Sequence, residues 1–168
     1  MCSEVTLSPS QQEVMDKFPI FLMDDNATDM IISGFAGSGK SFLVKYLADC
    51  VEDQMTIIRA IKPDAPRKRV LFAATTNKAA SVLQQMTGKE CRTIHKILGL
   101  VVKENKKNGT TTLEEMGQKT PLNHTVLFID EASMIDYELK QKIQAGRAKY
   151  KDCKIIFIGD SYQLPPVF

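Results

Sequence analysis

One eight-residue stretch, GFAGSGKS at positions 34–41, constrains the fold of this chain more than any other feature. It fits the pattern GxxxxGK[ST], in which glycines let the backbone N–H groups of a loop close around a phosphate. An apolar run at 30–33 precedes it, and large apolar residues recur at helical spacing from Ser41 to Cys50. This order of strand, loop and helix places an anion at the helix N-terminus, where the helix dipole favours negative charge. The sequence therefore predicts a nucleotide-binding loop.

The side chains that end this loop have separate expected tasks. Lys40 is expected to reach the β- and γ-phosphates, and the hydroxyl of Ser41 is expected to help hold Mg²⁺. The predicted nucleotide contacts are Gly34, Ala36, Gly37, Ser38, Gly39, Lys40, Ser41 and Phe42. The predicted cofactors are accordingly ATP and Mg²⁺.

Two adjacent carboxylates follow a second apolar run, at 126–129. Asp130 stands where the strand is expected to end, beside the phosphate-binding loop, and is a candidate Mg²⁺ ligand together with Ser41. Glu131 is expected to orient and activate the attacking water. A second carboxylate of this kind favours hydrolysis over phosphoryl transfer to a substrate.

Four apolar strand patterns alternate with helical patterns along the chain. Strands are predicted at 30–33, 70–74, 126–129 and 154–158, and helices at 41–50, 77–86 (closed by Gly88), 93–98 and 137–150, after a first helix that begins at Pro9. Continuous apolar strands between helices are typical of a parallel sheet covered on both faces, so the predicted fold class is α/β. Residues 52–69, which include Pro63 and Pro66, are predicted to form a surface excursion.

Residues 100–114 do not fit this alternation. Asn108-Gly109 lies between stretches with strand propensity, and Asn-Gly is a strong signal for a two-residue hairpin turn. We therefore predict a small β-hairpin inserted within residues 99–120, and a disordered polar loop is the alternative. The segment between Gly99 and Pro121 contains no Phe, Tyr or Trp.

Composition narrows the class of protein further. At 168 residues with 25% charged residues, the chain is expected to form one globular domain, 1–168. It carries no apolar run of membrane-spanning length and no secretory signal, so a cytoplasmic protein without a membrane partner is expected. Residues 78–107 hold seven Lys or Arg and two acidic residues. This excess predicts a face that binds a polyanion, or it solvates ordinary helix surfaces.

Several stretches together resemble the motifs of superfamily-one helicases. Asp130 to Met134 and Gly159 to Val167 resemble motifs II and III, most closely those of RecD-like and phage Dda-type DNA helicases. Leu7 to Gln12 resembles the Q-motif, Ala73 to Ala80 motif Ia, and Thr93 to His95 motif Ib. The resemblance spans residues 7–167 and implies a RecA-like P-loop NTPase fold.

The resemblance implies roles for residues that the pattern of the chain alone does not assign. Gln11 would read the adenine edge, and Gln163 would sense the γ-phosphate as a catalytic residue beside Lys40, Asp130 and Glu131. The residues implied to contact single-stranded DNA are Thr76, Asn77, Thr93 and His95. For Thr93 and His95 a helix cap and an exposed histidine remain the alternative.

As a whole, the resemblance implies the N-terminal motor domain of an ATP-dependent DNA helicase, moving 5′ to 3′, with replication or repair proteins as partners. It also implies that the inserted hairpin is the pin that splits the duplex. Motif III is followed at once by Phe168, so the second RecA-like domain of such helicases is expected outside this chain, with little hydrolysis by the chain alone. A regulatory nucleotide-binding module, a viral RNA helicase relative and a self-sufficient phosphotransferase remain alternatives. If the chain is phage-encoded, the expected compartment is the host cytoplasm.

Overall fold

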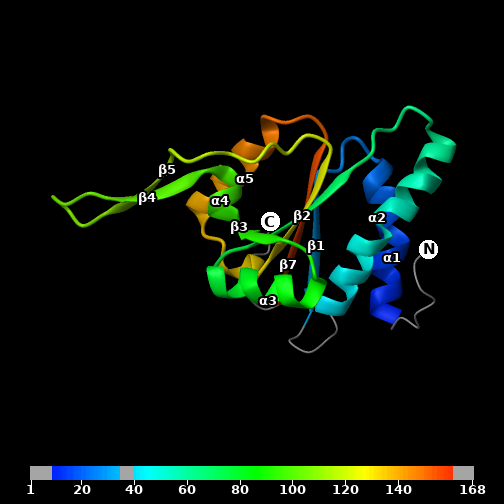
Figure 1. Ribbon diagram of the computed structural model, residues 1–168, viewed down its shortest axis with the longest axis horizontal. Coiled ribbons are helices and arrows are strands. Elements are labelled where there is room, and N and C mark those ends of the chain that lie inside the picture. The colour runs from blue at the N-terminus through cyan, green and yellow to red at the C-terminus, as the bar shows by residue number, and fades with distance from the viewer. Residues whose placement is uncertain (1–8, 35–39, 161–168) are drawn as a thin grey trace.

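The computed structural model describes residues 9–34 and 40–160. Its central sheet has five strands in the order β1-β7-β6-β2-β3 (Figure 1), and all of them run parallel. The strands are β1 (Asp29–Gly34), β2 (Arg69–Ala74), β3 (Cys91–Thr93), β6 (Thr125–Asp130) and β7 (Cys153–Asp160). All five strands start at the same end of the sheet, here called the amino edge, and finish at the opposite end, here called the carboxyl edge. These names refer to the ends of the strands and not to the outer strands β1 and β3. The predicted α/β class with a parallel core sheet is confirmed.

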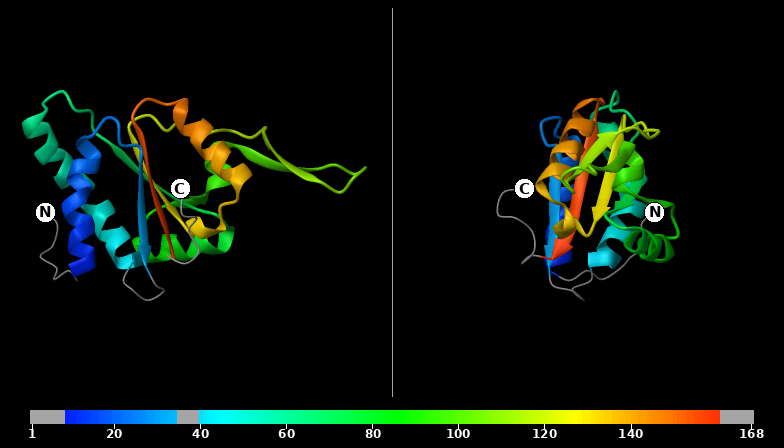
Figure 2. Two further views of the ribbon diagram at one scale, coloured as in Figure 1. Left: turned by 180° about the vertical axis from the view of Figure 1, so that it is seen from behind. Right: turned by 90° about the vertical axis from the view of Figure 1, so that its left-hand side faces the viewer.

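Helices cover both faces of the sheet (Figure 2). Along β6, Val126 and Phe128 join one buried cluster while Leu127 and Ile129 join the other, because successive side chains of a strand point to opposite faces. Phe128 also stacks on Phe72 of β2, with ring centroids 5.4 Å apart. The first cluster contains α1 (Pro9–Met23), α2 (Lys40–Ile61) and α3 (Asn77–Thr87), and the second contains α4 (Ile94–Leu98), the 3₁₀ helix η1 (Ala132–Met134) and α5 (Tyr137–Ala148).

Local capping chemistry sets both ends of α3. The Thr76 hydroxyl accepts a hydrogen bond from the N–H of Ala79 at 3.1 Å, which satisfies one of the free amides of the first turn of α3. The helix ends at Gly88, whose φ of 68° lies in the left-handed region. The predicted closure by Gly88 is therefore confirmed.

Helix α2 runs eleven residues beyond its predicted end at Cys50, to Ile61, so the expected surface excursion over 52–69 is wrong for residues 52–61. Met55 and Ile58 are buried at helical spacing against the first cluster, which continues the apolar face of the helix. The prolines lie after the last residue of the helix, so they do not interrupt it. The excursion that remains is the short connection at 62–68.

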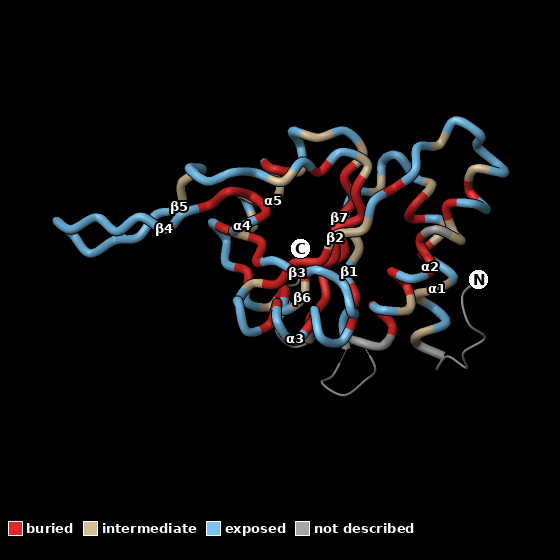
Figure 3. Tube along the Cα trace, viewed as in Figure 1, coloured by how far each residue is buried: buried red, intermediate tan, exposed pale blue. Residues whose placement is uncertain are grey.

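The inserted hairpin is confirmed as an antiparallel pair, β4 (Leu100–Glu104) with β5 (Thr111–Glu115), and it projects away from the sheet with mostly exposed residues (Figure 3). The predicted two-residue turn is wrong. The N–H of Asn105 donates to the carbonyl of Thr110, which closes a wider loop, and only Gly109 of the Asn-Gly pair has a positive φ. Side-chain oxygens of Asn105 and Asn108 accept loop amides, and this stabilises the longer turn.

Two further findings complete the fold. Strand β3 was not predicted, because three residues are too few to carry a period-two pattern. Within the described ranges, no helix combines the length and the apolar character that crossing a bilayer requires.

Candidate functional site at the carboxyl edge

The register of the parallel sheet brings the predicted site residues to one edge. Gly34, the last residue of β1, pairs with Asp160 at the end of β7. Asp130, the last residue of β6, pairs with Ala74 at the end of β2, and Ala74 pairs in turn with Thr93 at the end of β3. Five strand ends that are far apart in the sequence therefore form one row. Ligands of open α/β sheets bind at this edge.

The predicted nucleotide-binding loop joins β1 to α2, which begins at Lys40, so strand, loop and helix follow one another as expected. Of its predicted contacts, Ala36, Gly37, Ser38 and Gly39 lie outside the described residues, as does Gln163 after β7. For Gly34, Lys40, Ser41 and Phe42 the structure describes the backbone. Gln11 lies in the first turn of α1 and is partly buried.

The two carboxylates after β6 differ in their surroundings. One Asp130 oxygen accepts the N–H of Glu131 at 2.8 Å, which fixes the orientation of this carboxylate at the strand end. Burial, together with the negative charge of Asp130, raises the pKa of the Cys91 thiol to about 11, so the field of the carboxylate extends to β3. Glu131 is exposed, and among the described residues its carboxylate has no hydrogen-bond or ion-pair partner.

Glu131 also has an unusual backbone conformation. Its φ of 54° lies in the left-handed region, which costs a non-glycine residue about 1 kcal/mol or more. This conformation turns the chain sharply from β6 into η1, whose Met134 N–H donates to the Glu131 carbonyl at 2.9 Å. The turn leaves the carboxylate exposed at the strand end, where a water molecule could be activated.

The residues predicted to contact single-stranded DNA have structural roles as well. Thr76 caps α3, and Thr93, which is buried, caps α4 by accepting the N–H of Lys96 at 3.3 Å. His95 is partly buried in α4. The helix-cap alternative for Thr93 is thus present in the structure, whereas His95 is not the fully exposed histidine of that alternative. Asn77 is exposed at the start of α3.

A groove of about 260 Å³ brings Thr76 and His95 together at this edge. We call it the hairpin groove, because residues of the β4–β5 hairpin line it. Thr93 and Asn77 do not line it. The lining residues that sequence reasoning missed are Thr75, Val102, Thr111, Thr112, Leu113, Met134, Asp136, Glu138 and Leu139. No sequence signal identifies them, since they meet only when the hairpin folds back toward η1 and α5.

Two acidic residues fix the hairpin to α5. A Glu138 oxygen accepts the backbone N–H of Leu113 at 2.9 Å. At the hairpin base Glu115 pairs with Lys119 and, at 3.0 Å, with Lys149, the residue that caps the C-terminus of α5, and these hydrogen bonds lower the pKa of Glu115 to about 2. The hairpin is therefore tied directly to the helix that follows η1.

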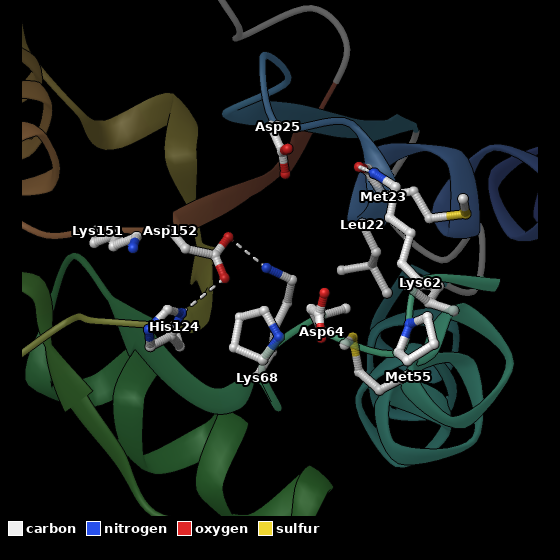
Figure 4. A pocket seen from close by; sticks show the side chains of 14 residues that line it. Leu22, Met23, Asp25, Met55, Lys62, Asp64, Lys68, His124, Lys151 and Asp152 are labelled. Atoms are coloured by element: carbon white, nitrogen blue, oxygen red, sulfur yellow. Dashed lines mark hydrogen bonds and ion pairs between the residues drawn. The ribbon is translucent and has the colours of Figure 1, made fainter. Parts of the chain in front are cut away.

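A second hollow, of about 850 Å³, lies at the amino edge (Figure 4). Its polar side is organised by Asp152, which accepts hydrogen bonds from the buried Lys68 and, at 3.0 Å, pairs with His124. Burial alone would raise the pKa of Asp152, but the hydrogen bonds from Lys68 and His124 outweigh this and lower it below its ordinary value. These charges are paired with each other, so they join the starts of β2, β6 and β7.

Comparison with known proteins identifies relatives over most of the chain. A family model described as an AAA domain matches residues 22–168. The chain is 27% identical over 161 residues to the ATP-dependent RecD2 DNA helicase of Deinococcus radiodurans, which covers 96% of this chain and 18% of that protein. It is 29% identical over 136 residues to the ATP-dependent DNA helicase dda of Enterobacteria phage T4 (81% and 28% covered). For the ATP-dependent DNA helicase Pif1 of Bdellovibrio bacteriovorus the identity is 27% over 176 residues (98% and 34% covered).

These matches confirm the resemblance to superfamily-one helicases of the RecD-like and Dda types. The chain spans about a fifth to a third of the length of these curated relatives.

Proposed function

The chain belongs to the AAA domain family, and from that premise we propose that it is the nucleotide-binding motor domain of an ATP-dependent DNA helicase. The observation that carries the proposal is the row of strand ends at the carboxyl edge. This row aligns the start of the GFAGSGKS loop with Asp130 and with the Thr76 segment. In the proposed mechanism one row of residues binds ATP and meets a nucleic acid strand.

In this proposal the backbone amides of residues 34–41 and the Lys40 ammonium bind the phosphates of ATP. The Ser41 hydroxyl and the Asp130 carboxylate are the proposed Mg²⁺ ligands, and hard oxygen donors of this kind suit that ion. Glu131 takes a proton from the attacking water. Gln11 and Gln163 are the proposed adenine and γ-phosphate contacts.

The DNA-binding part of the proposal concerns Thr76, Asn77, Thr93 and His95. Single-stranded DNA held there would change its contacts as ATP is hydrolysed at the neighbouring ends of the β-strands. The relatives are named as DNA helicases, which supports DNA as the nucleic acid, and the proposed direction, 5′ to 3′, rests on the motif resemblance alone. Relatives three to five times longer than this chain lead us to infer that fast, strand-stimulated turnover needs groups outside these 168 residues. An arginine supplied to such a site contributes about 10³–10⁵ in rate.

The test is Mg-ATP binding and ATP turnover, with and without single-stranded DNA, on this chain and on Lys40→Ala. Loss of a charge-assisted phosphate contact is expected to weaken nucleotide binding by about tenfold or more. Lys45→Ala, an exposed lysine farther along α2, is the matched control and is expected to bind as the parent does.

Each outcome has a separate meaning. If Lys40→Ala binds nucleotide as tightly as the parent, the proposed site is wrong. Turnover near background with nucleotide bound is the expected result for these 168 residues. Strong turnover stimulated by DNA and lost in Lys40→Ala would keep the site but contradict the need for outside groups. A strand preference for RNA would contradict DNA as the substrate.

A further inference from the structure

The β4–β5 hairpin joins the domain through a neck of two glycines. The chain enters the hairpin at Gly99, which ends α4 with a φ of 66°, and leaves it at Gly117. The N–H of Gly117 donates to the Gly99 carbonyl at 2.8 Å, and a Cβ atom on Gly99 would lie 2.6 Å from the Gly117 carbonyl oxygen. The two backbones therefore cross with no side chain between them. Such a crossing does not by itself fix the direction of a projecting hairpin, so contacts beyond the neck set it.

Two of these contacts come from α5, which lies beside the base of the hairpin (Figure 2). In the first turn of the helix, Glu138 accepts the N–H of Leu113 at 2.9 Å. At the other end of the helix, Lys149 pairs with Glu115 at 3.0 Å. Glu138 and Lys149 are about three helical turns apart, so they lie on the same side of α5. Strand β5 is therefore held at two points on one side of this helix.

Helix α5 is itself firmly placed. Between the two contacts, Gly146 lies against α4, because a Cβ atom there would be 2.8 Å from the Leu98 side chain. Leu139 and Ile143 are buried in the second cluster. Since α4 ends at the neck, α5 contacts the hairpin on the far side of the neck and packs on the helix that leads into it. The direction of the hairpin therefore follows the position of α5.

The N-terminal end of α5 leads back to the proposed hydrolytic carboxylate. The chain turns at Glu131, whose φ of 54° is strained, and backbone strain of this kind is found at switch regions. Ala132 and Ile135, which follow this turn, are buried, and the Asp136 carboxylate caps α5 by accepting the N–H of Leu139 at 2.8 Å. The connection between the turn and the helix is therefore short and packed, so a change in the turn displaces the helix.

We propose that Glu138 and Lys149 are positioning residues, which set the direction of the hairpin from α5 and carry a change in the Glu131 turn to it. This inference rests on the proposed function, because it takes nucleotide binding as the cause of that change. Neither Glu138 nor Lys149 is among the proposed nucleotide contacts. Their removal is therefore expected to free the hairpin without weakening nucleotide binding.

The test measures the distance between two spin labels, one at Lys107 in the hairpin loop and one at Gln85 of α3, both exposed. Non-natural amino acids carry the labels, so the native cysteines stay unchanged. In the parent chain we expect a narrow distance distribution, whose mean shifts by about 2 Å or more when a non-hydrolysable ATP analogue binds with Mg²⁺. In Glu138→Ala/Lys149→Ala the distribution is expected to become about twice as wide and the shift to be lost. The affinity for the analogue is expected to stay within about twofold of that of the parent.

Two matched double variants serve as controls. Glu138→Gln/Lys149→Arg keeps an oxygen that accepts the Leu113 N–H and keeps the positive charge, so it is expected to behave as the parent does. Lys103→Ala/Glu114→Ala removes an exposed ion pair of 2.9 Å within the hairpin and is also expected to behave as the parent does. Thermal unfolding of all variants checks that the fold is intact, since the replaced side chains are exposed.

The outcomes separate this inference from the proposed function. The inference is overturned if Glu138→Ala/Lys149→Ala keeps the narrow distribution or the shift, or if either control variant loses them. It is also overturned if the parent binds the analogue without a shift, and the nucleotide site of the proposed function then stands. If the parent does not bind the analogue, the proposed function fails and this inference fails with it.

Discussion

The two edges of the same sheet use their polar residues differently. At the amino edge Lys68, His124 and Asp152 bind one another, and the buried ammonium of Lys154 donates to the carbonyls of Asp24 and Ala27. At the carboxyl edge the Glu131 carboxylate and the Thr75 hydroxyl have no partner among the described residues. Polar groups paired within the fold stabilise it, and polar groups left unpaired remain available to a ligand.

The hollows at the two edges show the same contrast. The hollow at the amino edge is about three times larger than the hairpin groove, yet its central charges are already neutralised. Size alone therefore does not identify a functional site in this molecule. The state of the polar groups distinguishes the two hollows, because an unmade hydrogen bond is a cost that a ligand can remove.

The largest expected effect is on catalysis at the carboxyl edge. In a longer protein that includes the groups proposed to lie outside these 168 residues, Glu131→Gln is expected to lower ATP turnover by about 10²–10⁴-fold, because the amide cannot accept the proton of the water. Since this side chain is exposed and unpaired in the described fold, the free energy of unfolding is expected to change by less than about 0.5 kcal/mol. Glu104→Gln on the hairpin is the control for the loss of one negative charge. Marked destabilisation by Glu131→Gln would contradict the proposed difference between the two edges.

The complementary change at the amino edge is Asp152→Asn. It leaves the buried Lys68 without its carboxylate and is expected to lower the free energy of unfolding by about 2–3 kcal/mol, less than for a fully buried pair because Asp152 is 21% exposed. Nucleotide affinity of the folded protein is expected to be unchanged. Urea unfolding and nucleotide binding measure the two quantities. Asp64→Asn, in the same hollow, is the control, and an equal loss in this control would contradict the assignment.

Thr76 lies at the carboxyl edge but has a structural role, so it tests whether every polar group at that edge is available to a ligand. Thr76→Ala is expected to cost about 1 kcal/mol of unfolding free energy, because the N–H of Ala79 loses its acceptor. Thr76→Ser keeps the cap and is expected to restore most of this stability. If strand affinity follows stability in both variants, Thr76 acts only as a cap.

The smallest expected effect is a pH dependence at the amino edge. The pKa of Asp152 is lowered in the folded state, so its contribution to stability is present above the unfolded pKa of about 3.9. This contribution is lost as the pH falls through the lower, folded-state pKa. The difference in unfolding free energy between the parent and Asp152→Asn is therefore expected to shrink as the pH falls below about 4. Urea unfolding at several pH values measures it, and a difference that does not shrink below about pH 4 would contradict the pairing.

The parts of the fold that follow from local pattern could be predicted from the sequence. The apolar runs before Gly34 and Asp130 are strands, and their parallel arrangement follows from the helices between them. The length of α2 could not be predicted from local pattern, because the burial of Met55 and Ile58 depends on packing against other elements and the prolines after Ile61 are typical of a loop. The hairpin groove was not predicted because its lining residues, such as Val102 and Met134, are far apart in the sequence and meet only in three dimensions.

The strand order has a consequence for how the chain acquires its structure during synthesis. Of the strands that the structure describes in residues 9–34 and 40–160, β7 is the last to be made, yet it lies between β1 and β6. Until residues 153–160 leave the ribosome, these two strands lack a common neighbour and expose unpaired backbone at the middle of the future sheet. Completion of the core is therefore a late, long-range event, which favours slow folding. A nascent chain arrested before Cys153 would present two open apolar strand edges, the form in which this protein is most prone to aggregate.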